Sequence, residues 1–145
     1  MDHPDAMSDH FLQPLLASSD RFRMSLMIDG SRTPLASSVE AAVDSDSRRR
    51  GLLGRETLAP DTALVIAPCG AIHTVGMRFA IDAIFTARDG RVLKIVRAIA
   101  PRRVAACLGA FAVVEMAANE ADRHQVEVGD HLRIEAGSPP SQGPR

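Results

Sequence analysis

The chain of 145 residues carries 17 basic and 18 acidic side chains, which leaves a formal net charge of -1. This balance supplies no global field to attract nucleic acid or an anionic membrane. Five phenylalanines, with no tryptophan or tyrosine, offer few faces for stacking on sugars or unpaired bases. The length fits one domain, and we expect neither a nucleic-acid partner nor a membrane partner.

The first 23 residues show no sustained hydrophobic period, so we expect a loosely ordered N-terminal extension at 1–23. The apolar run in this segment is short, contains Pro14 and follows acidic residues, which is unlike a signal peptide. The chain also has no apolar run of about 18 residues, the length that a spanning helix requires. The sequence therefore predicts a cytoplasmic location.

Residues 24–135 contain short apolar segments, separated by turn residues at intervals of roughly ten. This spacing favours a mainly β fold over alternating strands and helices. We expect a compact single-domain β-sandwich or barrel-like fold with one or two short helices. The last segment, 136–145, is rich in Pro, Gly and Ser, and it is predicted to be a flexible C-terminal tail.

A short helix is predicted after the segment DSDS at 44–47, whose oxygen atoms can accept hydrogen bonds from unpaired amides at a helix start. Gly51 and Gly54 would each weaken a longer helix by about 1 kcal/mol relative to alanine. They favour close packing or a sharp exit from the helix. The positive end of the helix dipole, at the helix start, disfavours the three arginines at 48–50, so these side chains need other partners.

The clearest supersecondary unit is a hairpin at 77–101, because alternating apolar residues flank the turn pair Asp89-Gly90. Two nearly continuous apolar segments, 63–68 and 110–117, are expected to be central strands, and 131–135 a last strand. Along the first hairpin strand, alternate residues share a face. The face expected in the core carries Met77, Phe79, Ile81, Ala83 and Phe85, and the opposite face carries Arg78, Ala80, Asp82, Ile84 and Thr86.

Charged residues lie beside these apolar segments. Arg78 and Asp82 would stand roughly 13 Å apart on one strand, too far to pair with each other. Glu115, within an apolar run, is the natural partner for Arg78, because an uncompensated buried carboxylate costs several kcal/mol or takes up a proton. Either a structural Arg78–Glu115 pair or a binding pocket bordered by both residues fits this pattern.

Two cysteines, Cys69 and Cys107, are too few for a disulfide framework, and we expect both to be reduced. His73 lies four residues after Cys69, where it could activate a thiolate or share a metal ion with it. A Cys-x-x-x-His spacing alone is a weak zinc signal, so a loop histidine with ordinary hydrogen bonds is the simpler interpretation. Cys107 is expected to be a small buried hydrophobic residue.

Basic clusters at 48–50 and 102–103 are interpreted as solvated faces, because the chain lacks net positive charge and stacking residues. The sequence contains no phosphate-binding glycine-rich fingerprint and no Gly-x-Ser-x-Gly elbow. No sequence motif therefore supports nucleotide binding or α/β-hydrolase chemistry.

Four segments together resemble the family of domain of unknown function 192: RRRGLLGR at 48–55, APCGAIHTVGMRFAIDAIF at 67–85, VVEMAAN at 113–119 and VEVGDHL at 126–132. The resemblance covers about residues 24–135 and implies a compact β-sandwich-like domain without an established activity. The family usually has proline where this chain has Ala80, glycine at Asn119 and often tryptophan at Arg102. Asparagine tolerates a left-handed backbone, so the turn at Asn119 can survive.

The leading hypothesis is a noncatalytic binding domain for an unknown small polar ligand or protein partner, with no metal or cofactor assigned. The candidate ligand-binding residues are His73, Thr74, Arg78, Asp82, Glu115 and Arg55. One alternative is a hydrolase or metal-dependent enzyme that uses Cys69, His73 and Glu115. The other is an interaction or scaffold protein that docks its partner on the 48–55 face or on a strand edge.

Overall fold

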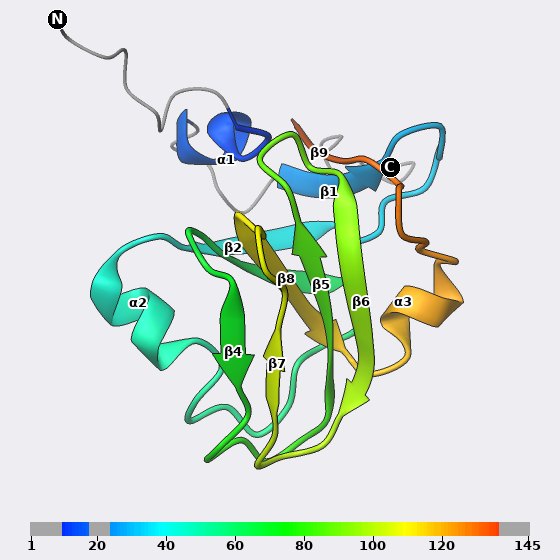
Figure 1. The fold of residues 1–145 in the computed structure, drawn as a ribbon. Helices are drawn as coiled ribbons and strands as arrows, with labels where there is room; N and C mark the ends of the chain where they lie inside the picture. The colour runs from blue at the N-terminus through cyan, green and yellow to red at the C-terminus, as the bar shows by residue number, and fades with distance from the viewer. Residues whose placement is uncertain (1–9, 18–23, 137–145) are drawn as a thin grey trace, which may run out of the picture.

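The computed structural model describes residues 10–17 and 24–136, and this part of the chain is mainly β (Figure 1). Its centre is a five-stranded sheet in the order β2-β3-β8-β5-β6, in which β2 and β3 are parallel and all other neighbours antiparallel. The five strands are β2 Ser38–Ala42, β3 Thr62–Ile66, β8 Ala112–Ala117, β5 Ile81–Thr86 and β6 Val92–Ile99.

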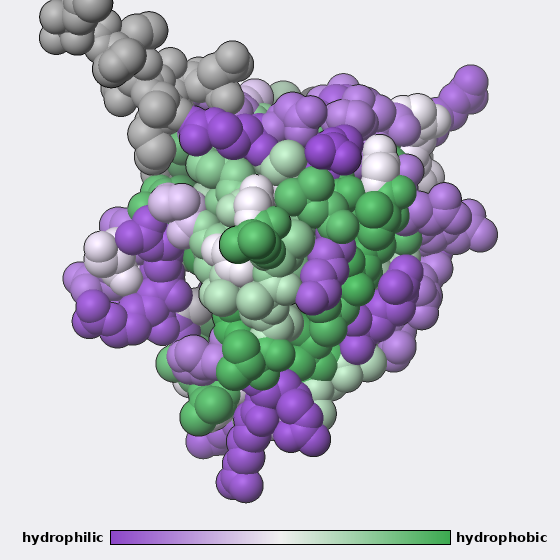
Figure 2. All heavy atoms as spheres, in the orientation of Figure 1, coloured by the Kyte–Doolittle hydropathy of each residue, from purple (hydrophilic) through white to green (hydrophobic). Residues whose placement is uncertain are grey.

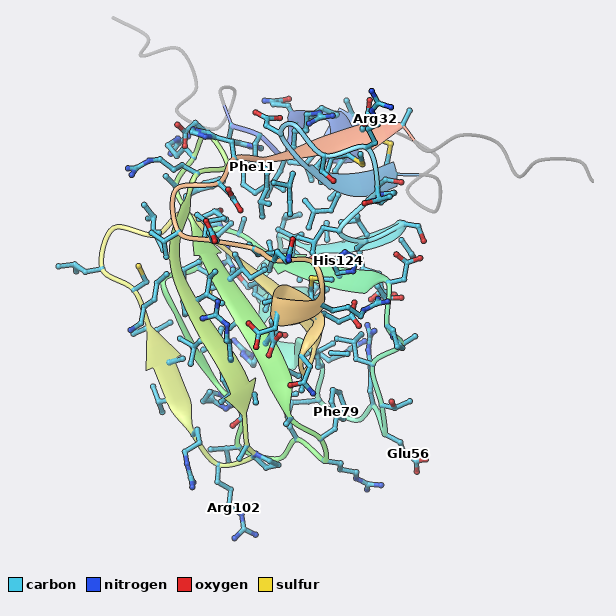
Figure 3. All side chains as sticks on the ribbon, turned by 90° about the vertical axis from the view of Figure 1, so that its right-hand side faces the viewer. Phe11, Arg32, Glu56, Phe79, Arg102 and His124 are labelled. Carbon is cyan, nitrogen blue, oxygen red and sulfur yellow. The ribbon has the colours of Figure 1, made fainter. Side chains whose placement is uncertain are left out.

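Two antiparallel pairs of strands form separate layers beside this sheet. β1 (Met24–Ile28) pairs with β9 (Leu132–Ala136) at the upper end in Figure 1, and β4 (Ala71–His73) pairs with β7 (Val104–Ala106) in front. The side view of Figure 3 shows the front pair standing off the central sheet. The expected mainly β class is confirmed as a layered arrangement, and the described sheets do not close into a barrel.

The three middle strands of the central sheet are buried on both faces, because each face has a hydrophobic core of its own. One core joins the sheet to β1, β9 and α1 (Gln13–Ala17), with Val65, Ile84 and Val114 from the central strands. The other core joins the opposite face to β4 and β7, with Ile66, Phe85 and Val113. These sets alternate along the strands, as the two-residue period of a pleated sheet requires.

The predicted hairpin is confirmed, with β5 and β6 antiparallel and Asp89-Gly90 in the turn. Gly90 has φ +89°, and a side chain there would collide with the backbone of Leu132, so both the turn and the packing require glycine. The predicted central strands are also found, as β3 and β8. The first hairpin strand begins at Ile81, however, so Arg78 lies in the loop before it and not on a strand face.

The described residues contain three short helices where one or two were expected. α2 (Ser45–Arg50) is capped by Asp44, which accepts a hydrogen bond from the Ser47 N–H at 2.8 Å. That bond lowers the pKa of the Asp44 carboxyl. Gly51, at φ +48°, ends the helix, so the three arginines occupy its last turn, where the dipole favours positive charge. The predicted sharp exit from the helix at Gly51 is confirmed. The expectation that the arginines are badly placed for the helix dipole is wrong, because the helix is shorter than predicted and ends at Arg50.

The other two helices lie near the ends of the described chain. α1 falls within the expected N-terminal extension, yet Leu12 and Leu15 are fully buried in the first core, so this part is folded. α3 (Glu120–Arg123) follows Asn119, whose φ of +76° confirms the left-handed turn. Segments 1–9, 18–23 and 137–145 lie outside the described residues, and with them most of the predicted tails. None of the helices in the described ranges is long and apolar enough to cross a membrane.

Candidate functional site

Glu115 is an acidic residue in the middle of the central sheet. It lies on β8 between Leu64 of β3 and Ala83 of β5, and only 4% of its surface is exposed. No hydrogen bond to its carboxyl group is found within residues 10–17 and 24–136. Burial raises the pKa of Glu115 to about 7, against the opposing attraction of Arg55. The group is therefore poised between its charged and neutral forms near neutral pH.

Arg55, not Arg78, is the cation near Glu115. The Arg55 guanidinium donates a hydrogen bond to Glu40 at 2.8 Å and attracts the Glu115 carboxylate from the same face of the sheet. Glu40 pairs in register with Leu64, which in turn pairs with Glu115, so the two acids stand in one row across three strands. Arg55 thus lies along a polar row in an otherwise apolar face.

The predicted pairing of Arg78 with Glu115 is wrong. Arg78 is 70% exposed and forms a 3.5 Å ion pair with Glu56, itself exposed. Figure 3 shows Glu56 at the lower end of the molecule, reaching outward, as does Arg102. The physical reason is that the strand starts at Ile81, four residues later than expected, which leaves Arg78 in a surface loop.

Glu115 borders a cavity of about 290 Å³ that lies between α2 and β4. In Figure 2 the hydrophilic surface of α2, at the left, is separated by a cleft from the more hydrophobic front over β4 and β7. The polar lining combines groups of both charges with a thiol and an imidazole. It consists of Arg48, Arg49, Arg50, Cys69, His73 and Glu115. The apolar lining includes Leu52, Ile66, Pro68, Ile72 and Met77.

A second cavity, of about 330 Å³, lies on the β2 side of the same segment. It is lined by Glu40 and Arg55, and it shares Arg50 and Gly51 with the first cavity. The chain around Gly51 therefore crosses the sheet face between the two cavities, and the RRRGLLGR segment borders both.

Two of the predicted site residues are structural. Thr74 is buried, and its hydroxyl donates to the Ala100 carbonyl at 2.7 Å and accepts from the Arg103 N–H at 2.9 Å. These bonds tie the loop after β4 to the segment before β7. Asp82 is fully buried, and its two oxygens accept the N–H groups of Ala98 at 2.8 Å and Ala121 at 2.9 Å. Neither residue lines the described cavities.

Cys69, His73 and Glu115, the residues of the enzyme alternative, all line the first cavity. No hydrogen bond joins them to one another in the described structure. The Cys69 thiol donates to the Ala71 carbonyl at 3.1 Å, and burial raises its pKa, so little of the nucleophilic thiolate is present. The described residues also contain no cluster of three or more His, Cys, Asp or Glu side chains suited to a metal ion. Both cysteines are free thiols, and Cys107 is only partly buried.

The arginines at 48–50 were not among the candidate ligand-binding residues, because the sequence interpretation assigned them to a solvated face or, in the scaffold alternative, to a docking face. None forms an ion pair with another described residue, and all three border the cavity. Arg48 is close enough to Cys69 to favour its thiolate form. Little signal of this role is present in the sequence, because Asp44 and Asp46 stand four residues before Arg48 and Arg50, at the spacing of helical ion pairs.

Comparisons with known proteins agree with this fold. A search of curated proteins found no match. Two solved structures match with TM-scores of 0.67. One, from Sinorhizobium meliloti 1021, is described as a candidate transcription regulator; it shares 25% identity over 77% of this chain and 91% of its own. The other, of unknown function, is from Novosphingobium aromaticivorans DSM 12444 and shares 21% identity over 75% of this chain and 83% of its own.

The family model for domain of unknown function 192, described as an uncharacterised group (Uncharacterized ACR), matches residues 26–134. This span includes every residue that lines the two cavities. The chain belongs to the DUF192 family.

Proposed function

We propose that this protein is a noncatalytic binding domain whose small polar ligand occupies the cavity between α2 and β4. The observation that carries the proposal is the Glu115 carboxyl, which is almost fully buried yet has no hydrogen-bond partner among the described residues. The Glu115 carboxyl opens onto the cavity, so its hydrogen-bond partners come from whatever occupies that cavity, which favours a polar ligand there.

The form of the cavity supports a small ligand over a large one. Its volume of about 290 Å³ lies near the lower end of the roughly 300–1,000 Å³ that small-molecule sites occupy. Apolar walls with a few convergent polar groups are also typical of such sites. The protonated Cys69 thiol weighs against nucleophilic catalysis in the same place.

Thermal unfolding in the presence of small polar compounds tests the proposal. A ligand at about 100 times its Kd stabilises the folded protein by about 2.7 kcal/mol, which raises Tm by several degrees. Ala71→Phe places a large side chain at the cavity wall and is expected to abolish this shift. Ala106→Phe is the matched control, because Ala106 is the exposed cross-strand partner of Ala71 and does not line the cavity.

The control variant is expected to respond to the same compounds as the wild type. If compounds shift all three proteins equally, binding takes place elsewhere and the proposal fails. If no compound in a broad library of acids, amines, sugars and nucleosides shifts the wild type, it fails as well.

A second candidate, a docking domain for a protein partner, is favoured by one feature. Val104 on β7 and Leu108 in the turn after it are exposed aliphatic side chains, and Leu108 is fully exposed. Cross-linking of the purified chain, compared between wild type and Leu108→Glu, tests this candidate. Only monomer in the wild type would count against self-association. The cytoplasmic location and the lack of nucleic-acid and membrane partners remain predictions.

A further inference from the structure

The cavity has two chemically opposite sides. On the sheet side, Glu115 projects from the central strand β8, and on the helix side three arginines project from α2. The walls between them are apolar, with Leu52, Ile66 and Ile72 in the lining. A ligand that spans the cavity therefore meets an acidic group at one end and basic groups at the other.

The acidic end of the cavity can bind a cation that carries hydrogen-bond donors. The strand neighbours of Glu115, Leu64 and Ala83, are apolar and offer no side-chain donor. Arg55, the nearest cation, already donates to Glu40 at 2.8 Å. A primary ammonium group supplies both charge and up to three donors, and charge-assisted bonds of this kind are about twice as strong as neutral ones.

The basic end of the cavity can bind an anion. Arg48, Arg49 and Arg50 form no ion pair with other described residues, so their guanidinium groups are available to a ligand. Guanidinium groups bind carboxylates in a bidentate geometry, which adds orientation as well as energy. The helix they belong to ends at Arg50, and its negative dipole end adds no attraction for the anion, so the side chains alone supply it.

We infer that the ligand of this cavity is a small amino acid in the broad sense, with a primary ammonium group on Glu115 and a carboxylate on the α2 arginines, joined by a short apolar linker. This inference rests on the proposed function and names the ligand class for the same cavity. The ammonium supplies the missing partner of Glu115, the carboxylate neutralises the arginines, and the linker fills the apolar walls.

Binding of this kind releases protons. In the empty cavity burial raises the pKa of Glu115 to about 7, against the attraction of Arg55, so part of the population carries a proton there near neutral pH. An adjacent ammonium group favours the carboxylate and expels that proton. The other charged or titratable groups of this cavity are Cys69 and His73, from the loop before β4 and from β4 itself, and the three arginines on the α2 side.

Titration calorimetry of the full chain tests the inference, with 4-aminobutanoate, 6-aminohexanoate and 8-aminooctanoate as probes. Hexanoate lacks the ammonium and hexylamine lacks the carboxylate, so they are the matched controls. We expect at least one amino acid to bind about tenfold or more tightly than both controls, the effect of one charge-assisted bond. Repeating the titration at pH 7 in two buffers of different ionisation enthalpy should show a net release of protons on binding.

Two variants test whether Glu115 is the source of the proton release. Glu115→Gln is expected to remove both the proton release and the preference for the amine, because a neutral amide neither titrates nor attracts a cation. Arg78→Ala is the control and is expected to keep the proton release, because the exposed Arg78 side chain pairs with Glu56 and does not line the cavity. Net proton uptake, or hexanoate binding as tightly as every amino acid, would overturn the inference.

The outcomes also separate this inference from the proposed function. If the amino acids do not bind, but diacids or neutral compounds stabilise the wild type and not Ala71→Phe, then the ligand class is wrong and the cavity still binds a small molecule. If no compound distinguishes the wild type from Ala71→Phe, both ideas fail.

Discussion

Asp82 and Glu115 are two buried carboxylates on adjacent strands, and their surroundings differ completely. Asp82 on β5 is paired in register with Met116 and faces the core of β1, β9 and α1. Glu115 on β8 is paired with Ala83 and faces the core of β4 and β7. Both are at most 4% exposed, so burial alone does not distinguish them.

The difference lies in the donors that meet each group. Asp82 accepts two backbone N–H groups, one from the strained Ala98, at φ +49°, and one from Ala121 in α3. Glu115 accepts none among the described residues and borders a cavity instead. A satisfied carboxylate holds the fold together, whereas an unsatisfied one beside a cavity indicates a binding site.

The largest effect is expected for Asp82→Ala. The change leaves the buried N–H of Ala121 and the partly buried N–H of Ala98 without acceptors, so the free energy of unfolding should fall by about 3 kcal/mol. Urea denaturation measures it. Asp122→Ala is the control, because this exposed acid of α3 only pairs with Arg97 at the surface. A loss below about 1 kcal/mol for Asp82→Ala would refute its structural role.

The next largest effect is expected for Glu115, and it depends on pH. The folded protein holds a proton on Glu115 up to about pH 7, whereas the unfolded chain releases it near pH 4.5. Between these values the folded state binds more protons, so the free energy of unfolding falls as pH rises, by about 3 kcal/mol in all. Glu115→Gln removes this contribution and should be more stable than the wild type at pH 8.

Urea denaturation at pH 5 and pH 8 measures this difference for both proteins. Glu56→Gln, a change of an exposed glutamate, is the control. Its free energy of unfolding should change between pH 5 and pH 8 as that of the wild type does. Equal slopes in wild type and Glu115→Gln would mean that Glu115 ionises normally, and the comparison with Asp82 would lose its basis.

The sequence predicts those parts of the fold that depend on short-range pattern. The hairpin of β5 and β6 follows from alternation around Asp89-Gly90, and the burial of β3 and β8 follows from their continuous apolar residues. The pairing of β4 with β7 was not predicted, because strands of three residues show no measurable period. α1 was missed for a similar reason, since this five-residue helix gains its stability from packing its own Leu15 and the preceding Leu12 into the core.

The candidate site was predicted in part, and the failures share one cause. His73 and Glu115 line the first cavity and Arg55 the second, whereas Thr74 and Asp82 are tied to backbone groups. The donors of Asp82 come from residues 16 and 39 positions away. A polar residue in an apolar segment looks the same in the sequence whether a distant amide satisfies it or not. Only tertiary structure separates the two cases.

The smallest effect is expected for Arg55, and it tests which cation acts on Glu115. Arg55→Ala removes an attraction that favours the charged carboxylate, so the pKa of Glu115 should rise above about 7. The carbon-13 NMR shift of the Glu115 side-chain carboxyl, followed against pH, reports this directly. Arg78→Ala is the matched control, because its exposed partner is Glu56 and its removal should leave the Glu115 titration unchanged. A larger shift with Arg78→Ala than with Arg55→Ala would restore the pairing expected from sequence, and it would mean that the polar row of Glu40, Arg55 and Glu115 does not control the acid at the cavity.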